Sequence, residues 1–438
     1  MEKTAESLAQ EVAAMREMLS KVSTAIDVYA ETATKNLGRK DVRSRGEDSE
    51  KHVDLFMATS KLMSTVRGPV DMVFSNFENS VHSGSLRAVL EMGVFDALPQ
   101  DGSSASATTL AEKLGAEKDI LGRFGTNSVT LLGDWSADWI RSTVRLMRVL
   151  TPLGPFEEVG EEEYKHTPYS MVYLVPEIRG IFKLMYDEYN LANARMYEWF
   201  RNSGFKSPDD HLNNPYCYAH QTGDKNMWEY IGSFPGRFEN LNLAMIAQTE
   251  ATKWTAGVFP FTEELSKLQS DDETVLVVDI GGGSGHVTKQ IKEFADGIPG
   301  QIVLQERPEV IESIGDKLHE IKKMEYDFFT PQPLKGAAIY YIRRCLHDWP
   351  DDDCVKILTQ IAGAMEPGKS RLVVSEIVIP PTEADVETAW MDITMMVLTG
   401  RERTEKQWKN LLELSGLKLK KIHYGPGTNY AALEAERA

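Results

Sequence analysis

Residues 275–285 constrain the fold of this chain more than any other stretch. The run Val-Leu-Val-Val-Asp-Ile-Gly-Gly-Gly-Ser-Gly is typical of a buried strand that ends in an acid and a glycine loop, and an amphipathic helix begins near Ser284. A strand that stops at glycines lets the next helix present free backbone N–H groups to a ligand. The segment therefore predicts a nucleotide pocket in an α/β fold, and a tight turn without a ligand is the structural alternative.

The glycine spacing narrows the kind of nucleotide. A dinucleotide fingerprint requires Gly-x-Gly-x-x-Gly, but the third residue after Gly283 is His286. The pattern Gly281-x-Gly283-x-Gly285, with Asp279 before it, instead resembles the first motif of class I S-adenosylmethionine-dependent methyltransferases.

Length and composition limit the class of protein. A chain of 438 residues with 42% hydrophobic content exceeds what one core usually supports, so we expect two domains. The net charge of −18 argues against nucleic acid or an anionic membrane as a partner. Cys217, Cys345 and Cys354 lack metal-ligand spacing, which predicts a reducing compartment without disulfides or a metal site. Because no signal peptide or membrane-spanning stretch is evident, we expect a soluble, cytoplasmic protein.

The first thirty residues predict a helix that packs on another helix. Apolar residues recur at alternating spacings of four and three, and the partner helix could belong to a second chain or to the same one. A charged segment over 35–51 is interpreted as a solvated linker. The apolar positions are Leu8, Val12, Met15, Leu19, Val22, Ile26 and Tyr29.

The next region is expected to be mostly helical with a winged-helix character. Amphipathic helices are predicted over 86–98, after the capping box at 109–112 and through 143–150, and short apolar pieces between turn residues predict a β-hairpin over 153–164. Winged helices often bind DNA, but the acidic wing opposes phosphate contact and favours a protein–protein role. Its acids are Glu157, Glu158, Glu161, Glu162 and Glu163.

Residues 124–139 do not match the helical pattern of this region. They separate the start of the third helix at 120–123 from its continuation at Thr143, and a helix does not tolerate so many turn residues in its interior. Two interpretations stay open, a surface excursion from the domain and a retained intron in the gene sequence.

The C-terminal half alternates strand and helix, which predicts a mostly parallel, doubly wound sheet with ligands beyond the carboxyl ends of its strands. Strands are expected at 274–280, 301–305, 337–342, 371–377, 417–424 and 429–433, and helices at 285–296, 308–320, 351–366 and 404–415. The expected segments are an N-terminal helix and linker (1–52), a winged-helix dimerisation domain (53–190), connecting helices that line a substrate site (191–255) and a catalytic domain (256–438).

Polar residues follow the strands at that edge of the predicted sheet. Glu306 closes the second strand, where an acid can accept both ribose hydroxyls of an adenosine. Asp327 could receive the adenine amino group while Phe328 covers the ring. His347 follows a buried strand, and an imidazole is well suited to take a proton from a hydroxyl near neutral pH. Each residue has a structural alternative, as a common strand-end acid or a loop cap.

Two acids are candidate partners of His347. Glu376 ends the following strand, and Glu402 lies in the run Arg-Glu-Arg-Thr that ends at residue 404. Neighbouring strand ends can direct carboxylates at one imidazole, which fixes its tautomer and stabilises its protonated form.

Six motifs together make a family resemblance specific. Their order and spacing resemble the caffeic-acid-type O-methyltransferases of plants and fungi, and the N-terminal half resembles the winged-helix dimerisation domain of that family. The resemblance covers most of residues 85–435 and implies a class I methyltransferase fold in a homodimeric, metal-independent enzyme that methylates phenolic or related hydroxyls with S-adenosylmethionine. The motifs lie at 278–285, 346–349, 355–358, 367–369, 392–396 and 400–404.

The resemblance also implies roles for single residues. The residue matching His347 is the general base, and those matching Glu376 and Glu402 orient it. Two positions depart from the plant pattern, because Glu306 replaces a usual Asp and Phe328 stands where Met is frequent. The methyl donor would contact Asp279, Gly281, Gly283, Gly285, Glu306, Asp327, Phe328 and Arg343.

The methyl acceptor is expected between the domains, against Met245, Trp390, Met391 and Met395, for which plain helical core is the alternative. Two other functions compete with methyl transfer. One is a methyltransferase-fold pericyclase or dehydratase of fungal secondary metabolism, which need not keep the base. The other is a non-enzymatic dimeric regulator, which the acidic wing disfavours. The presence of His347 with Glu376 and Glu402 favours methyl transfer.

Overall fold

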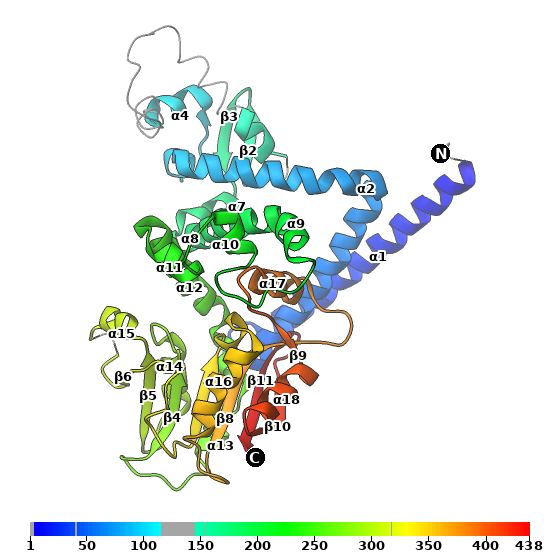
Figure 1. Cartoon of the computed structure of the whole chain (residues 1–438). Coiled ribbons are helices and arrows are strands. Elements are labelled where there is room, and N and C mark those ends of the chain that lie inside the picture. Colours follow the sequence, from blue (N-terminus) through cyan, green and yellow to red (C-terminus); the bar gives the residue numbers. More distant parts are fainter. Residues whose placement is uncertain (1–3, 40–41, 115–144, 153, 317) are drawn as a thin grey trace, which may run out of the picture. The chain divides into compact units, whose positions relative to one another are not determined.

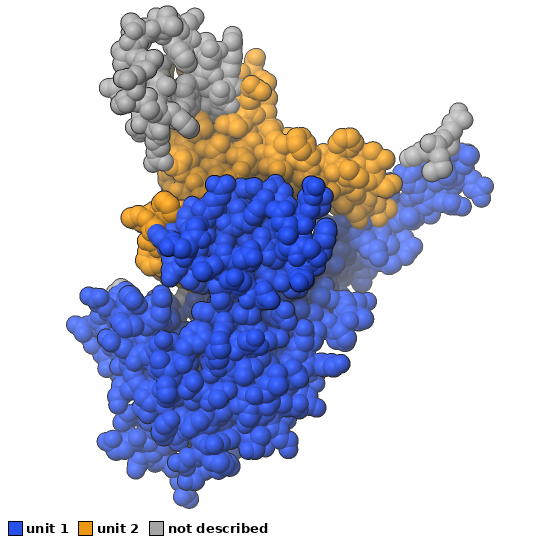
Figure 2. Space-filling view, in the orientation of Figure 1, with its two compact units in different colours: residues 1–62, 191–230, 248–438 blue, residues 63–190, 231–247 orange. Residues whose placement is uncertain are grey.

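The computed structural model describes residues 4–39, 42–114, 145–152, 154–316 and 318–438, so the unusual stretch 124–139 lies outside the described residues. The chain forms two compact units, which Figure 2 distinguishes by colour. Unit 1 comprises residues 1–62, 191–230 and 248–438, and unit 2 comprises residues 63–190 and 231–247.

Two long helices open the chain. Helix α1 (Ala5–Asn36) begins at a capping box in which the Thr4 hydroxyl accepts a hydrogen bond from the Ser7 backbone N–H at 3.1 Å. Helix α2 (Val42–Met92) is interrupted at Gly68, which has a φ of 73° and precedes Pro69. The predicted charged linker is therefore shorter than expected. Lys, Arg and Glu are good helix formers, and a charge-rich run is compatible with an exposed helix as well as with a linker.

The apolar seam of α1 is only partly covered within unit 1. Val22 is buried, and the Tyr29 ring lies 5.6 Å from the ring of His52 on α2, whereas Leu8 and Leu19 are exposed. Packing on the same chain thus accounts for part of the seam.

Unit 2 has its core between helices and a small three-stranded sheet in the order β1-β3-β2. Strands β2 (Phe156–Gly160) and β3 (Glu163–His166) pair antiparallel, which confirms the predicted hairpin, and β1 (Ala105–Ser106) pairs with β3. Phe95, Phe156 and Tyr164 are buried in this core. The further elements of unit 2 are α3 (Val94–Ala97), α4 (Ala107–Leu114), helical residues 145–150, α7 (Pro168–Met171), η1 (Val172–Leu174), α8 (Pro176–Leu184) and the π-helix η2 (Met185–Asn190).

Unit 1 contains a twisted sheet with the order β10-β11-β8-β7-β4-β5-β6, and β9 pairs with β8 (Figure 1). The pairs from β6 to β8 are parallel, and β11 runs antiparallel to both β8 and β10. The strands are β4 (Val275–Ile280), β5 (Gln301–Glu306), β6 (Lys322–Glu325), β7 (Ile339–Arg343), β8 (Arg371–Ile379), β9 (Arg403–Thr404), β10 (Leu417–Tyr424) and β11 (Tyr430–Arg437).

Helices cover both faces of this sheet. Along β7, Tyr340 and Ile342 join the core beneath α16 and α18, whereas Ile339 and Tyr341 join the core beneath α13 and α14. Strands that are buried on both faces read as continuous apolar runs, as this one does. The predicted doubly wound α/β fold is confirmed. The helices are α13 (Phe261–Leu265), α14 (His286–Phe294), α15 (Pro308–Ile314), α16 (Asp351–Ala362), α17 (Val386–Met396) and α18 (Glu405–Leu414).

Three details differ from the sequence-based prediction. Helix α15 ends at Ile314 rather than near 320, because Gly315 takes a φ of 54°. Strand β6 was not predicted, since its sequence Lys-Lys-Met-Glu has no apolar run, and β9 is only two residues long. The remaining elements are α9 (Leu191–Ser203), α10 (Pro215–His220), α11 (Met227–Gly232), α12 (Pro235–Thr252), η3 (Lys253–Val258) and η4 (Leu346–Asp348). Among the described helices, none combines the length and apolarity needed to cross a bilayer.

Candidate active site

The order of the strands predicts a binding crevice beside β4. The chain passes from β4 to its neighbour β5 and later returns to pair β7 with the other edge of β4. Loops that leave the carboxyl ends of two such strands diverge and create a binding crevice. Here these loops are residues 281–285 after β4 and residues 344–348 after β7.

The first loop depends on its glycines. Gly281, Gly283 and Gly285 have φ values of 69°, 56° and 79°. A Cβ atom on Gly281 would lie 2.8 Å from Cys345 Sγ, and one on Gly285 would lie 2.4 Å from Leu318 Cδ1. Nothing lies within 4 Å of the corresponding position on Gly283. Two of the glycines therefore permit close packing, and Gly283 borders open space in which a ligand could approach the backbone.

Two acidic side chains, Asp279 and Glu306, make hydrogen bonds beside this loop. Asp279 is buried and accepts a hydrogen bond from the Thr288 hydroxyl on α14 at 2.5 Å, and burial raises the pKa of its carboxyl to about 6 against the effect of that bond. Glu306 Oε1 accepts the Gly283 N–H at 3.3 Å, and its Oε2 accepts the Arg307 N–H at 2.7 Å. Asp279 thus ties strand to helix, while Glu306 stands at the edge of the loop.

The other residues that were predicted to contact the methyl donor differ in their surroundings. Asp327 is exposed and accepts the Phe329 N–H at 3.0 Å, and the Phe328 ring lies edge-on to Trp349 at 6.0 Å. Arg343 is bound elsewhere, because its guanidinium donates to the Thr255 hydroxyl at 3.1 Å and to the Thr252 hydroxyl at 2.6 Å. The Arg343 side chain therefore ties the end of β7 to the end of α12 and to η3.

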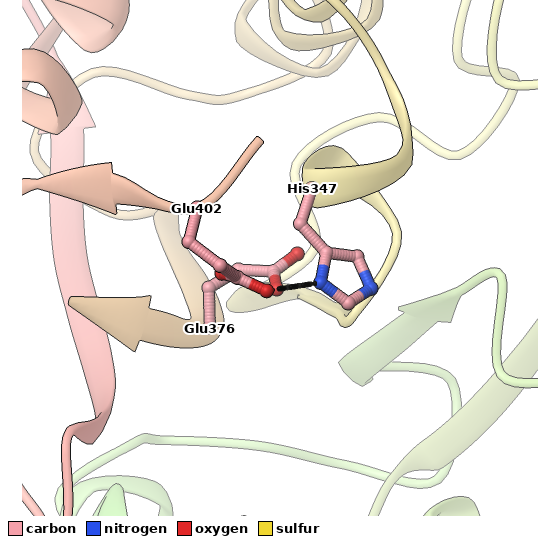
Figure 3. Close-up of side chains that lie close together, drawn as sticks. All are labelled: His347, Glu376 and Glu402. Carbon is pink, nitrogen blue, oxygen red and sulfur yellow. Dashed lines mark hydrogen bonds and ion pairs between the residues drawn. The ribbon is translucent and has the colours of Figure 1, made fainter. Parts of the chain in front are cut away.

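The second loop carries the predicted base. His347 lies in the short helix η4 and is only 4% exposed. Its Nδ1 atom is 2.7 Å from Glu402 Oε1 and 3.8 Å from Glu376 Oε2 (Figure 3). Its Nε2 atom points away from the two glutamates, makes no hydrogen bond to any described residue and lies 3.7 Å from Asp348 Oδ1. The structure thus brings together the three residues that sequence reasoning grouped.

The two glutamates are themselves held in place. Glu376 Oε1 accepts the backbone N–H groups of Cys345 and Leu346, each at 3.0 Å, which ties the end of β8 to the His347 loop. The Glu402 N–H donates to Asp392 Oδ1 at 3.0 Å. The Oε2 atoms of both glutamates are buried without a hydrogen-bond partner among the described residues.

This group favours a charged imidazole. Burial opposes the charge, but the carboxylates of Glu376, Glu402 and Asp348 outweigh it and raise the pKa of His347 to about 9. Burial also raises the pKa of the Glu376 carboxyl, against the attraction of His347. In the absence of ligands, the imidazole is therefore a cation at neutral pH.

The same three side chains could in principle hold a metal ion. Within the described part of the chain they are the one cluster of this kind, with one ligand atom each and all such atoms within 4.8 Å of one another. A separation of 2.7 Å between Nδ1 and Oε1 is that of a charge-assisted hydrogen bond, so a proton accounts for the arrangement.

The predicted acceptor contacts fall into two groups. Trp390, Met391 and Met395 lie on α17 in unit 1, where Trp390 is 38% exposed and both methionines are buried. Met245 is exposed on α12 in unit 2.

Sequence reasoning missed several residues that shape the site. Asp348 and Asp392 lie inside two of the family motifs, at 346–349 and 392–396. Their sequence positions could therefore have indicated that Asp348 lies near His347 and Asp392 near Glu402. Arg403 follows Glu402 directly, and its contacts with the His347 loop became visible only in the structure.

Comparisons with known proteins agree with this geometry. A family model described as an O-methyltransferase domain matches residues 213–418, and one described as an O-methyltransferase dimerisation domain matches residues 75–176. The O-methyltransferase kntB of Aspergillus niger is 39% identical over 87% of both chains. The crystal structure of OxaC in complex with SAH and oxaline is 32% identical, covers 96% of this chain and 100% of its own, and has a TM-score of 0.77. LepI in complex with SAM is 23% identical over 95% of this chain and 99% of its own, with a TM-score of 0.74, a likeness of fold alone.

Proposed function

Because the chain belongs to the O-methyltransferase family, we propose that it transfers the methyl group of S-adenosylmethionine to a hydroxyl of a small secondary metabolite. The acceptor hydroxyl is phenolic, and His347 is the general base. One observation carries this proposal. A buried imidazole has one nitrogen fixed by a carboxylate at 2.7 Å and the other directed away from both glutamates.

The glycine loop fits the methyl donor. The space beside Gly283 admits a ligand close to the backbone, and the Glu306 carboxyl at the end of β5 is placed for the ribose hydroxyls. Asp327 and Phe328, after β6, would meet the adenine. When bound, the donor supplies a sulfonium-activated methyl group, so the protein has only to position and deprotonate the acceptor.

The chemistry of His347 follows from its two nitrogens. In the neutral imidazole, Nδ1–H donates to Glu402 and Nε2 accepts the proton of the acceptor hydroxyl. The oxygen then forms a bond to the methyl carbon while the carbon–sulfur bond breaks, and the electron pair of that bond stays on sulfur. The proton on Nε2 is later released to solvent, and the two glutamates stabilise the imidazolium in the meantime.

The lining we propose for the acceptor is apolar. Trp390 on α17 is 38% exposed, and Met391 and Met395, which are buried on the same helix, add flexible side chains that suit a flat phenolic compound. No metal takes part in this proposal, since the imidazole alone removes the proton.

The proposal includes a homodimer. The part of α2 in unit 2 exposes Val70, Val73, Phe74 and Phe77, with exposed fractions between 60% and 70%. Contiguous apolar side chains on a helix surface mark a protein interface, and the dimerisation-domain match begins at residue 75.

A pericyclase or dehydratase on the same fold is the second candidate, and one observation favours it. An imidazole with a pKa of about 9 is a proton donor at neutral pH, and such chemistry can use an acid without methyl transfer.

Incubation of the purified protein with methyl-labelled S-adenosylmethionine and a panel of phenols separates the two candidates. We expect label in the phenol, and a donor that binds while its label never reaches any acceptor would favour the second candidate. His347→Ala should reduce turnover by at least about 100-fold with little change in donor affinity, as expected for loss of a general base. His319→Ala, which alters an exposed histidine outside the site, is the matched control. Unchanged turnover in His347→Ala would end the proposed role of His347.

A further inference from the structure

The segment 400–403 lies directly against the turn that carries His347. The Arg401 backbone N–H donates to the His347 carbonyl at 2.8 Å, and the Glu402 side chain meets His347 Nδ1. A Cβ atom on Gly400 would lie 2.2 Å from the same His347 carbonyl oxygen, so only glycine allows the backbones to come this close.

The next residue, Arg403, binds both ends of the turn. Its side chain is fully buried, and its guanidinium donates to the Leu346 carbonyl at 3.0 Å and to the Trp349 carbonyl at 2.8 Å. These two carbonyls flank His347 in the sequence. The guanidinium also donates through Nε to Asp351 Oδ1 at 2.9 Å, and its plane lies 5.1 Å from the Trp408 ring.

The guanidinium therefore donates to the carbonyls at both ends of one short turn and to a carboxylate at the start of the next helix. A planar fork with five N–H groups can bridge two carbonyls and a carboxylate at once, whereas an ammonium group is a single compact donor centre. The carbonyls at the end of η4 would otherwise be buried with fewer partners, which is unfavourable.

We propose that Arg403 is a positioning residue that clamps the turn from Leu346 to Trp349 and so keeps His347 within hydrogen-bond reach of Glu402. The inference rests on the proposed role of His347. Arg403 and Glu402 are adjacent in the chain, so one short segment supplies both the carboxylate that binds the imidazole and the cation that fixes its backbone. Thr404 then caps α18 through Gln407, which anchors the segment on its other side.

The test compares Arg403→Lys with Arg401→Gln. Arg401 lies two residues away, carries the same charge and is 37% exposed, and its side chain pairs with the second oxygen of Asp351 at 3.4 Å. We expect Arg403→Lys to lower kcat/KM for the acceptor by at least tenfold, to leave the Kd for S-adenosylmethionine within about threefold of the original and to lower the pKa of His347. Arg401→Gln should change none of these quantities.

The pKa of His347 is read by NMR from labelled histidine in the full-length protein. This measurement does not depend on methyl transfer, so failure of the clamp and failure of the proposed function are distinguishable. A folded Arg403→Lys variant whose His347 pKa and kcat/KM equal those of the original protein would overturn the clamp. Equal losses of donor affinity and turnover would also overturn it, because they indicate general damage to the fold.

A milder variant covers the case in which Arg403→Lys does not fold. Asp351 is 45% exposed at the start of α16, and Asp351→Asn removes its negative charge but keeps a side-chain oxygen that can accept the Arg403 Nε–H. The same shifts are expected in the same direction and to a smaller extent. An unchanged His347 pKa and unchanged kcat/KM in Asp351→Asn, after loss of Arg403→Lys, would count against the clamp.

Discussion

The charge on His347 predicts an unusual dependence of turnover on pH. A general base must be neutral, but the carboxylates around His347 overcome the effect of burial and raise its pKa to about 9. At pH 7 only about one molecule in a hundred then carries a neutral imidazole. In the enzyme without its methyl donor, the reactive form should therefore increase about tenfold for each pH unit up to 9.

Binding of the methyl donor should change this value. The sulfonium carries a positive charge, and two unit charges about 5 Å apart repel by about 3 kcal/mol at an effective dielectric constant of about 20. Because about 1.4 kcal/mol corresponds to one pKa unit, the pKa of His347 should fall by about two units in the complex. The bound donor would thus release the proton that the empty site retains.

The assay measures initial rates with labelled donor between pH 6 and 10 at constant ionic strength. At donor concentrations far below KM, kcat/KM reports the enzyme before the donor binds, and kcat reports the complex. We expect kcat/KM to rise with pH and to level off near pH 9. We expect kcat to rise in the same way and to level off near pH 7. A kcat/KM that is constant from pH 7 to 9, or a kcat limb at higher pH than the kcat/KM limb, would refute the reasoning. Circular dichroism at each pH checks that the fold persists.

Three further predictions concern single features of the site. Glu402→Gln should move the kcat/KM limb to lower pH, because one of the carboxylates that raise the pKa of His347 is lost, and a limb that stays near pH 9 would contradict this. Gly285→Ala should weaken donor binding by at least about tenfold, since its Cβ would meet Leu318 at 2.4 Å and its φ is positive. Gly283→Ala has open space for its Cβ in the protein without ligands, but the proposed donor occupies that space, so donor binding should weaken here as well, and calorimetry compares the two affinities. Treatment with EDTA should leave turnover unchanged, and loss of activity that Mg²⁺ or Zn²⁺ restores would show a metal at the glutamates.

The sheet could be predicted because its local patterns agree with its tertiary environment. The strand that begins at Val275 is apolar on both faces and ends at glycines, and the structure covers both of its faces with helices. Strand β6 has no such pattern, since its four residues are exposed or only partly buried and it lies at the edge of the sheet, paired with β5. Tertiary pairing of this kind leaves little trace in a single sequence.

The N-terminal region shows a different limit of prediction from sequence. Residues 42–51 form the start of α2 although their charge density resembles that of a linker. Helix propensity of Lys, Arg and Glu is high, so charge distinguishes exposure from burial but does not distinguish a helix from an irregular segment.

The identities of the residues around His347 could be predicted, because His347 follows β7, Glu376 lies near the carboxyl end of β8 and Glu402 directly precedes β9, which pairs with that end of β8. The protonation state of His347 that these residues produce could not be predicted. Burial and three carboxylates act in opposite directions on one imidazole, and the nearest carboxylate comes from a residue 55 positions away. A change in any of these distances alters the balance, because Coulomb interactions in a buried site are weakly screened. The backbone contacts around the turn, among them those that we propose for Arg403, therefore affect the protonation state of His347 together with the acids beside it.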